Sequence, residues 1–291
     1  MKILIQNYTS VLTTEALYLN NCFSKINSVK SGIWDQNRSS VFDALDTFQP
    51  DVLLCGYNTN KLNDIIKYLN GNKNIDLIIN ISGIDQRSMS IIENMLEINS
   101  IKCPFFISNL HEKIFNIKPK NKVFNLLPAV DLFLQKQNLP DFNLEFGILS
   151  NSKELAEKID TKNMPHHKLG IANTDKYFDI NVSALNMVSL YQKYKKIIIA
   201  ANLPVALSQF FFDSIFYSTN VSVKTDNQKL FNEILSDLFD QENQDTQEDI
   251  FSIIKKQIKN KHTCFNRSAR LAQALKAENA SKELLKIAEG L

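Results

Sequence analysis

Two apolar stretches, DVLLCGY (51–57) and DLIINISG (76–83), decide the fold of this chain. The segment between them, TNKLNDIIKYLNGN (59–72), has the apolar spacing of a helix. Short apolar strands that alternate with helices of this length are typical of βαβ units on a parallel sheet. Both stretches are apolar almost throughout, as strands covered on both faces require. This part of the chain therefore predicts a Rossmann-like α/β fold.

The same alternation extends over residues 1–130. In one predicted helix Ser40 is the expected N-cap, and Val41, Leu45 and Phe48 fall on one face. Further strands are expected at KILIQNY (2–8), VKSGIWD (29–35) and CPFFISN (103–109), and further helices at 13–26, 39–48 and 85–99.

Residues 121–141 interrupt this pattern. Pro128 and Pro140 bracket an apolar stretch there, which we interpret as a connection between two domains. The alternation then resumes, with strands expected at 143–151, 166–173, 196–202 and 221–226, and helices at 152–160, 182–194, 209–218 and from 228 onward. The predicted parts are a Rossmann-like domain over 1–130, a second one over 131–260, and C-terminal helices over 261–291 that pack back across the domains.

Composition excludes several classes of protein. The 291 residues are 44% hydrophobic and 22% charged with a net charge of +2, as in an ordinary globular protein, so wholesale disorder is excluded. No apolar run reaches about 18 residues, and the first residues are typical of a strand, so we expect a cytoplasmic protein. The cysteines show neither a CxxC pair nor a histidine at ligand spacing, so no metal site is expected; they are Cys22, Cys55, Cys103 and Cys264.

The well-known glycine-rich and catalytic motifs are absent. There is no GxGxxG after the first strand, and no Walker A, GxSxG or HExxH sequence. This argues against dinucleotide oxidoreductases, P-loop phosphotransferases, serine hydrolases and zinc peptidases. Ligands of open parallel sheets bind outside the carboxyl ends of the strands. Two such domains that face each other suit a donor substrate on one side and an acceptor on the other.

Two stretches carry a resemblance to a known family. Residues 191–227, YQKYKKIIIAANLPVALSQFFFDSIFYSTNVSVKTDN, resemble the donor-binding region of GT-B glycosyltransferases, and of their spore-maturation-type subgroup in particular. Residues 261–275, KHTCFNRSARLAQAL, resemble the C-terminal motif of that subgroup. The matching residues are Tyr191, Lys195 or Lys196, Gln209, Phe211, Phe212 and Asp213, and then His262, Thr263, Asn266, Arg267 and Ala269. The resemblance covers the last third of the chain, whereas residues 1–130 match by architecture alone.

The resemblance implies a GT-B fold, in which two Rossmann-like domains face each other across a cleft. It also implies a glycosyltransferase (a hexosyl- or pentosyltransferase) whose donor is a nucleotide-diphosphate sugar, with a UDP-sugar favoured. Asp213 takes the place of the ribose-binding acid, and we expect it in the first turn of its helix; the alternative is an acid favoured there by the helix dipole alone. The other donor-binding candidates are Lys195, Asn202, Ser208, Gln209 and Arg267.

Two positions depart from the family pattern. Phe210 stands where the subgroup has an arginine, and Ser218 stands where it has a glycine. The missing arginine removes a bidentate phosphate contact, so another cation must neutralise the leaving diphosphate. The candidates are Lys195, Lys196, Lys224 and Arg267, of which Lys195 and Arg267 lie in matched motifs.

The N-terminal domain offers residues for the acceptor side. Asp85 follows the fourth strand and is a candidate base for an inverting transfer; the alternative is that it caps the next helix. Thr9 and Ser10 after the first strand, and Asp35 after the second, face the cleft by topology and are candidates for binding the acceptor.

These observations predict a metal-independent glycosyltransferase without a cofactor. GT-B enzymes generally work without a bound divalent ion, and the chain has no DxD motif. The resemblance favours a glycan or a lipid-linked saccharide as acceptor. Two alternatives stay open. One is a phage-type DNA glycosyltransferase acting on hydroxymethylated cytosine, although residues 1–130 hold only two arginines and no lysine stripe. The other is a catalytically inactive GT-B-like module that binds a nucleotide or sugar, as Phe210 and Ser218 suggest.

Overall fold

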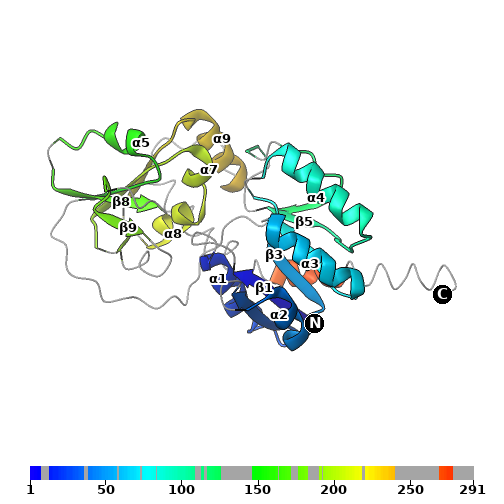
Figure 1. Ribbon diagram of the computed structural model, residues 1–291. Helices are drawn as coiled ribbons and strands as arrows, with labels where there is room; N and C mark the ends of the chain where they lie inside the picture. Colours follow the sequence, from blue (N-terminus) through cyan, green and yellow to red (C-terminus); the bar gives the residue numbers. More distant parts are fainter. Residues whose placement is uncertain are drawn as a thin grey trace. The chain divides into compact units, whose positions relative to one another are not determined.

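The structure, a computed structural model, shows two compact units (Figure 1). Unit 1 comprises Met1–Leu126 and Cys264–Leu291, and unit 2 comprises Leu127–Thr263. The structure describes residues 1–7, 13–35, 39–57, 59–72, 74–82, 84–108, 113–114, 117–125, 146–162, 164–171, 176–182, 190–191, 193–217, 220–239 and 269–277.

Unit 1 contains a parallel sheet with the strand order β2-β1-β3-β4-β5-β6. The five predicted strands are confirmed. The short strand β6 was missed because it lies within the predicted connection. The strands are β1 (Lys2–Asn7), β2 (Lys30–Asp35), β3 (Val52–Gly56), β4 (Asp76–Asn80), β5 (Phe106–Ser108) and β6 (Val123–Asn125), and the helices are α1 (Thr13–Phe23), α2 (Val41–Phe48), α3 (Thr59–Gly71) and α4 (Gln86–Ile98).

The two decisive strands, β3 and β4, are buried along their whole length. Their side chains alternate between the two faces of the sheet. Leu53 and Leu77 pack in a core cluster with residues of α2, α3 and α4. Leu54 and Ile78 pack in a second cluster with residues of β1 and α1. Helices therefore cover both faces, which explains why these strands are almost uniformly apolar.

Local signals set the bounds of α2 as expected. The Ser40 hydroxyl accepts a hydrogen bond from the backbone N–H of Asp43 at 3.1 Å, so Ser40 is the N-cap. Val41 and Leu45 are buried and Phe48 is half-buried. The helix ends at Gln49, which adopts a left-handed conformation with φ 49°.

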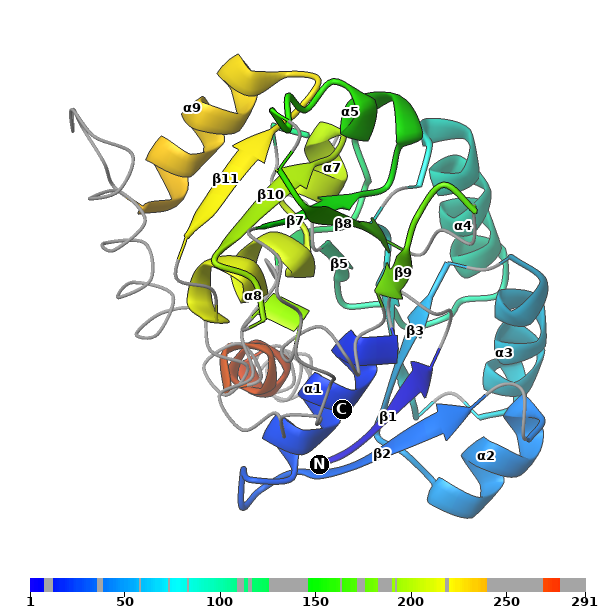
Figure 2. The same cartoon turned by 90° about the vertical axis from the view of Figure 1, so that its left-hand side faces the viewer.

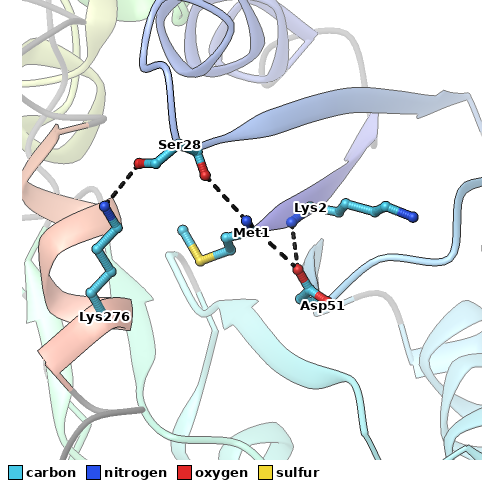
Figure 3. A network of polar contacts seen from close by, with 5 residues as sticks. All are labelled: Met1, Lys2, Ser28, Asp51 and Lys276. Atoms are coloured by element: carbon cyan, nitrogen blue, oxygen red, sulfur yellow. Dashed lines mark hydrogen bonds and ion pairs between the residues drawn. The ribbon is translucent and has the colours of Figure 1, made fainter.

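A helix from the far end of the chain, residues 269–277, completes the core of unit 1. Leu271, Ala272 and Leu275 are buried in the same cluster as residues of β1 and α1, and the helix lies beside α1 (Figure 2, red). Lys276 Nζ donates to the hydroxyl of Ser28 at 2.8 Å. Ser28 also contacts the first residue of the chain. Its carbonyl accepts a hydrogen bond from the terminal amino group of Met1 at 3.1 Å (Figure 3).

Unit 2 contains a second parallel sheet, with the strand order β11-β10-β7-β8-β9. The four predicted strands are confirmed. Strand β9 and helix α7 were missed, and Val182 ends β9, so the expected helix at 182–194 does not begin there. The strands are β7 (Phe146–Ser150), β8 (His166–Ile171), β9 (Ile180–Val182), β10 (Lys196–Ala200) and β11 (Val221–Lys224), and the helices are α5 (Lys153–Glu157), α7 (Leu203–Ala206), α8 (Gln209–Tyr217) and α9 (Gln228–Phe239).

No helix in the described ranges combines the length and the apolar character that crossing a bilayer would need.

Candidate functional site at the strand switch point of unit 2

The strand order of unit 2 marks one position on its sheet. From β7 the chain proceeds to β8 and β9 on one side, and it then returns to form β10 and β11 on the other. The order of the strands therefore reverses between β7 and β10. In open parallel sheets ligands bind at the carboxyl ends of the strands that flank such a switch point.

The residues that follow these two strands are joined by hydrogen bonds. Asn151 Nδ2 donates to Asn202 Oδ1 at 3.0 Å, and the backbone N–H of Asn202 donates to Asn151 Oδ1 at 3.4 Å. One residue earlier, the hydroxyl of Ser150 donates to the carbonyl of Ala200. Asn151 and Asn202 are both half-buried. The switch point is therefore lined by two uncharged amides held in a fixed relation.

The start of α7 is fixed from the neighbouring strand. Asp226, just after β11, accepts a hydrogen bond from the backbone N–H of Leu203 at 2.7 Å. Asn202 is the N-cap by position but makes no side-chain cap bond, so its amide is available to Asn151. Lys224 ends β11, is exposed, and is in register with Ala200 of β10. Lys224 is therefore a cation at the carboxyl edge of the strand next to β10.

Ser208 lies at the junction between α7 and α8. Its hydroxyl donates to the carbonyl of Val205 at 2.7 Å, and its own carbonyl accepts the N–H of Phe211 at 3.0 Å. Asn202 precedes α7 and Ser208 follows it, so two of the predicted donor-binding residues flank this short helix. Both are half-buried.

The structure separates Lys195 from this group. It immediately precedes β10 and is exposed. It therefore lies at the amino edge of the sheet, roughly 16 Å along the strand from the residues at the carboxyl edge. The prediction that Lys195 contacts the donor diphosphate is not supported by this placement, because a parallel strand keeps its two ends on opposite edges of the sheet. Of the cations considered from the sequence, Lys224 occupies the carboxyl edge.

Asp213 does not lie in the first turn of its helix, and that expectation is wrong. Helix α8 begins at Gln209, so Asp213 is its fifth residue. Its side chain has 0% exposed surface. Burial, together with the nearby charge of Asp213, raises the pKa of the Tyr191 phenol well above its ordinary value. The enclosed acid faces the protein interior, so its role as a ribose ligand stays a prediction that this placement does not favour.

The family arginine position is also an interior position in this chain. Phe210 is 6% exposed, and the hydroxyl of the buried Tyr191 donates to its carbonyl at 3.1 Å. Phenylalanine therefore fills core space at this position. The predicted candidates Thr9, Ser10 and Arg267 lie outside the described residues, as do Ser218 and the side chain of Gln209.

On the sheet of unit 1, Asp85 is the N-cap of α4. Its Oδ1 accepts a hydrogen bond from the backbone N–H of Ser88 at 2.7 Å. This bond is the main cause that lowers the pKa of the Asp85 carboxyl, which is fully exposed. The capping alternative is therefore confirmed, whereas the role of Asp85 as a base stays a prediction. Asp35 ends β2 at the same edge and is half-buried.

Sequence reasoning missed Asn151. A signal was present, because the polar run Ser150, Asn151, Ser152 directly follows the apolar strand that opens the second sheet. The first strand of a doubly wound sheet always borders the switch point, so its carboxyl end is the first place to look. Within the described ranges, no three His, Cys, Asp or Glu side chains form a group that could hold a metal ion.

Comparisons with solved structures bear on the fold. No known protein family matches the chain, and no curated protein matches its sequence. A structure titled Spinosyn Forosaminyltransferase SpnP is similar over 95% of this chain and 99% of its own, with a TM-score of 0.52 and 8% identity. The S. aureus MnaA–UDP co-structure is similar over 94% and 96%, with a TM-score of 0.51 and 9% identity. A UDP-N-acetylglucosamine 2-epimerase is similar over 97% of both chains, with a TM-score of 0.50 and 9% identity. The chain thus has the GT-B fold of two parallel-sheet α/β domains; the spore-maturation subgroup is not shown.

Proposed function

We propose that this protein is a glycosyltransferase that binds a nucleotide-diphosphate sugar at the carboxyl edge of the unit 2 sheet and transfers the sugar to a hydroxyl acceptor. The observation that carries the proposal is the Asn151–Asn202 pair at the switch point of a GT-B fold. In this scheme the amides bind uncharged hydroxyl or base groups of the nucleotide. Lys224 supplies positive charge toward the diphosphate, in the place of the family arginine.

Several features support a UDP-sugar as the donor. The MnaA structure of the same fold carries UDP by its title, and SpnP is named as a forosaminyltransferase. The chain has amide and hydroxyl groups at the switch point but no glycine-rich phosphate loop. A donor held mainly by hydrogen bonds to ribose and base, with one lysine for the diphosphate, fits these groups. We further propose that the reaction needs no divalent ion.

The first test is a thermal-shift panel of UDP, GDP and dTDP and their sugar conjugates. A nucleotide present at 100 times its Kd stabilises the folded state by about 2.7 kcal/mol, which corresponds to roughly 5–8 °C in Tm for a chain of this size. We expect such a shift with at least one UDP compound. Asn202→Ala should weaken that binding about tenfold, because it removes one side of the amide pair.

The matched control is Asn232→Ala. Asn232 is an exposed asparagine on α9 of the same unit, and it contacts only Gln228 at 3.3 Å among the bonds described. Its replacement should leave nucleotide binding unchanged. Equal binding by wild type, Asn202→Ala and Asn232→Ala would remove the switch point as the donor site.

The second test is the reaction itself, followed by release of free nucleotide in the presence of EDTA. Wild type should release nucleotide from the donor that binds, by transfer or by slow hydrolysis. Strong inhibition by EDTA would contradict metal independence. Binding without turnover of any UDP- or GDP-sugar would identify the inactive binding module instead. Because one similar structure is named as an epimerase, the sugar product is also analysed, and an epimerised nucleotide-sugar would replace the transferase proposal.

No observation favours the DNA acceptor. The carboxyl edge of the unit 1 sheet carries the acids Asp35 and Asp85, with Lys61 and Arg87 as cations in the helices that follow β3 and β4. A surface for the DNA backbone needs a clear excess of positive charge, which the described residues of this edge do not provide. We therefore propose a saccharide hydroxyl as the acceptor group.

A further inference from the structure

One buried polar group in unit 1 has no role in the packing described above. Asn80 is the last residue of β4 and is 2% exposed. It is in register with Gly56 at the end of β3. Because β1 and β3 flank the point where the strand order of unit 1 reverses, Asn80 stands one strand from that switch point, at the carboxyl edge where ligands bind in such sheets.

Hydrogen bonds fix the orientation of the Asn80 amide. Its Oδ1 accepts from the backbone N–H of Ser82 at 3.0 Å and from the Ser82 hydroxyl at 2.7 Å. A backbone N–H can only donate, so the oxygen of the amide must face Ser82. The amide nitrogen is therefore held on the opposite side. It cannot be exchanged with the oxygen without losing the backbone contact.

This amide nitrogen is the group that needs an explanation. Asn80 Nδ2 is buried, and no acceptor in the described part of the chain lies within hydrogen-bond distance of it. Burial of an unsatisfied donor costs free energy, and native proteins rarely retain one without a ligand, a water molecule or a functional reason. The neighbouring strand position, Gly56, has no side chain beside it, and its N–H is already bonded to Gln6 Oε1 at 3.1 Å.

The surroundings indicate the chemistry of the missing acceptor. The donor is uncharged, and the polar neighbour that holds it, Ser82, is uncharged as well. Among the described residues of this edge, the acids Asp35 and Asp85 balance the cations Lys61 and Arg87, so no excess of positive charge attracts an anion. A phosphate or a carboxylate is therefore disfavoured, whereas the oxygen of a sugar hydroxyl is a suitable partner for a neutral amide donor.

We propose that Asn80 Nδ2 donates a hydrogen bond to a hydroxyl oxygen of an uncharged sugar bound at the carboxyl edge of unit 1, and that Asn80 thereby selects the acceptor. Identifying this sugar as the acceptor rests on the proposed glycosyltransferase function. The sugar-binding site itself does not, because it is inferred from the amide alone.

Binding is tested on wild-type protein labelled with ¹⁵N-asparagine. The Asn80 side-chain signals are assigned by their disappearance in Asn80→Ser, and the protein is titrated with methyl glucoside, methyl galactoside and methyl mannoside. We expect at least one neutral glycoside to shift the Asn80 Nδ2 signals saturably, and glucose 6-phosphate to leave them unchanged. The proposal is overturned if no glycoside shifts them, or if a duplex containing hydroxymethylcytosine does so in place of the sugars.

Turnover provides the second readout. With the donor saturating, Asn80→Ser should raise the KM for the glycoside acceptor about 3- to 10-fold, as expected for one lost neutral hydrogen bond. The control is Asn72→Ser, at an exposed asparagine of the same unit whose Nδ2 bonds the carbonyl of Tyr68 at 3.3 Å.

The two proposals fail in different ways. A wild type that neither binds nor turns over any nucleotide-sugar refutes the proposed function, while the glycoside titration still decides the Asn80 site. A wild type that transfers sugar, with less than a 2-fold change in acceptor KM for Asn80→Ser, refutes the role of Asn80 and leaves the function standing.

Discussion

At the scale of single residues, Gly147 in β7 shows how closely unit 2 is packed. A Cβ atom at this position would lie 2.9 Å from Leu169 Cδ1 and 3.3 Å from the ring of Tyr194. Real Cβ atoms essentially never come within 3.0 Å of another atom, so the Leu169 methyl group must move, and the Tyr194 ring must give way by a few tenths of an ångström. We expect Gly147→Ala to lower the free energy of unfolding by about 1–3 kcal/mol, measured by urea denaturation.

Gly71 is the matched control for that substitution. It ends α3, and a Cβ atom there would meet nothing within 4 Å. Gly71→Ala should be neutral or should stabilise by up to about 1 kcal/mol, because alanine restricts the unfolded chain more than glycine does. A Gly147→Ala variant as stable as Gly71→Ala would show that β7 is less tightly packed than described.

The two roles of Asp85 are separable by substitution. Asparagine is as good an N-cap as aspartate, so Asp85→Asn should keep the melting temperature at pH 7, while Asp85→Ala should lower it. If Asp85 is also the base predicted from the sequence, Asp85→Asn must lose at least about 100-fold in transfer rate despite its stability. A transfer rate equal to that of wild type would leave Asp85 as a cap only.

The cap also has a pH signature. The folded-state pKa of Asp85 is lowered from its ordinary value of 3.8, so the ionised cap stabilises the folded state fully above that pH. Wild type should therefore have a higher melting temperature than Asp85→Ala at pH 7. This difference in melting temperature should decline as the pH falls below 3.8 through the folded-state pKa of Asp85. Thermal melts of both proteins over this range measure it. A difference in melting temperature between the two proteins that stays constant to low pH would contradict the hydrogen bond between Asp85 and Ser88.

At the scale of elements, prediction from sequence depended on length and on periodicity. The strands of five or six residues were all found, because each forms a distinct apolar run. Of the three-residue strands, β5 was found because it lies in the apolar stretch 103–109, whereas β6 lies in the predicted connection and β9 runs into a predicted helix, so both were missed. The four-residue helix α7 was missed because it is too short to show a helical period. Helix α8 begins at Gln209, so Asp213 lies beyond its first turn.

The candidate site was less predictable than the fold for a different reason. Asn202 was identified through the resemblance, but its partner Asn151 lies 51 positions away in sequence. Only the strand order brings these two loops together, and strand order does not follow from the pattern of any one segment. The Asn80 amide was likewise inaccessible from sequence, because its unsatisfied nitrogen depends on the orientation that Ser82 imposes.

At the scale of the whole molecule, helix 269–277 packs in the core of unit 1, which also contains the first residues of the chain. Leu275 is 1% exposed in the core cluster of β1 and α1. Leu275→Ala should lower the free energy of unfolding by about 2–5 kcal/mol, because it leaves a cavity in that core. We expect faster hydrogen exchange in β1 and α1, measured by mass spectrometry, and little change in unit 2.

Gln273→Ala is the control, since Gln273 is exposed on the same helix. It should change stability by less than about 0.5 kcal/mol. Equal exchange rates for Leu275→Ala and Gln273→Ala in β1 would show that the helix is not part of that core.

This return of the chain has a consequence for its synthesis on the ribosome. Lys276 and Ser28, which contact each other, are 248 positions apart. At about 5–20 residues per second, the ribosome needs roughly 7–30 s to translate unit 2 after residue 126. During that interval the apolar face around Ile3, Ile5 and Ile78 lacks its final cover. The half that emerges first therefore completes its core last, and a nascent chain stalled before residue 269 would present that face to chaperones.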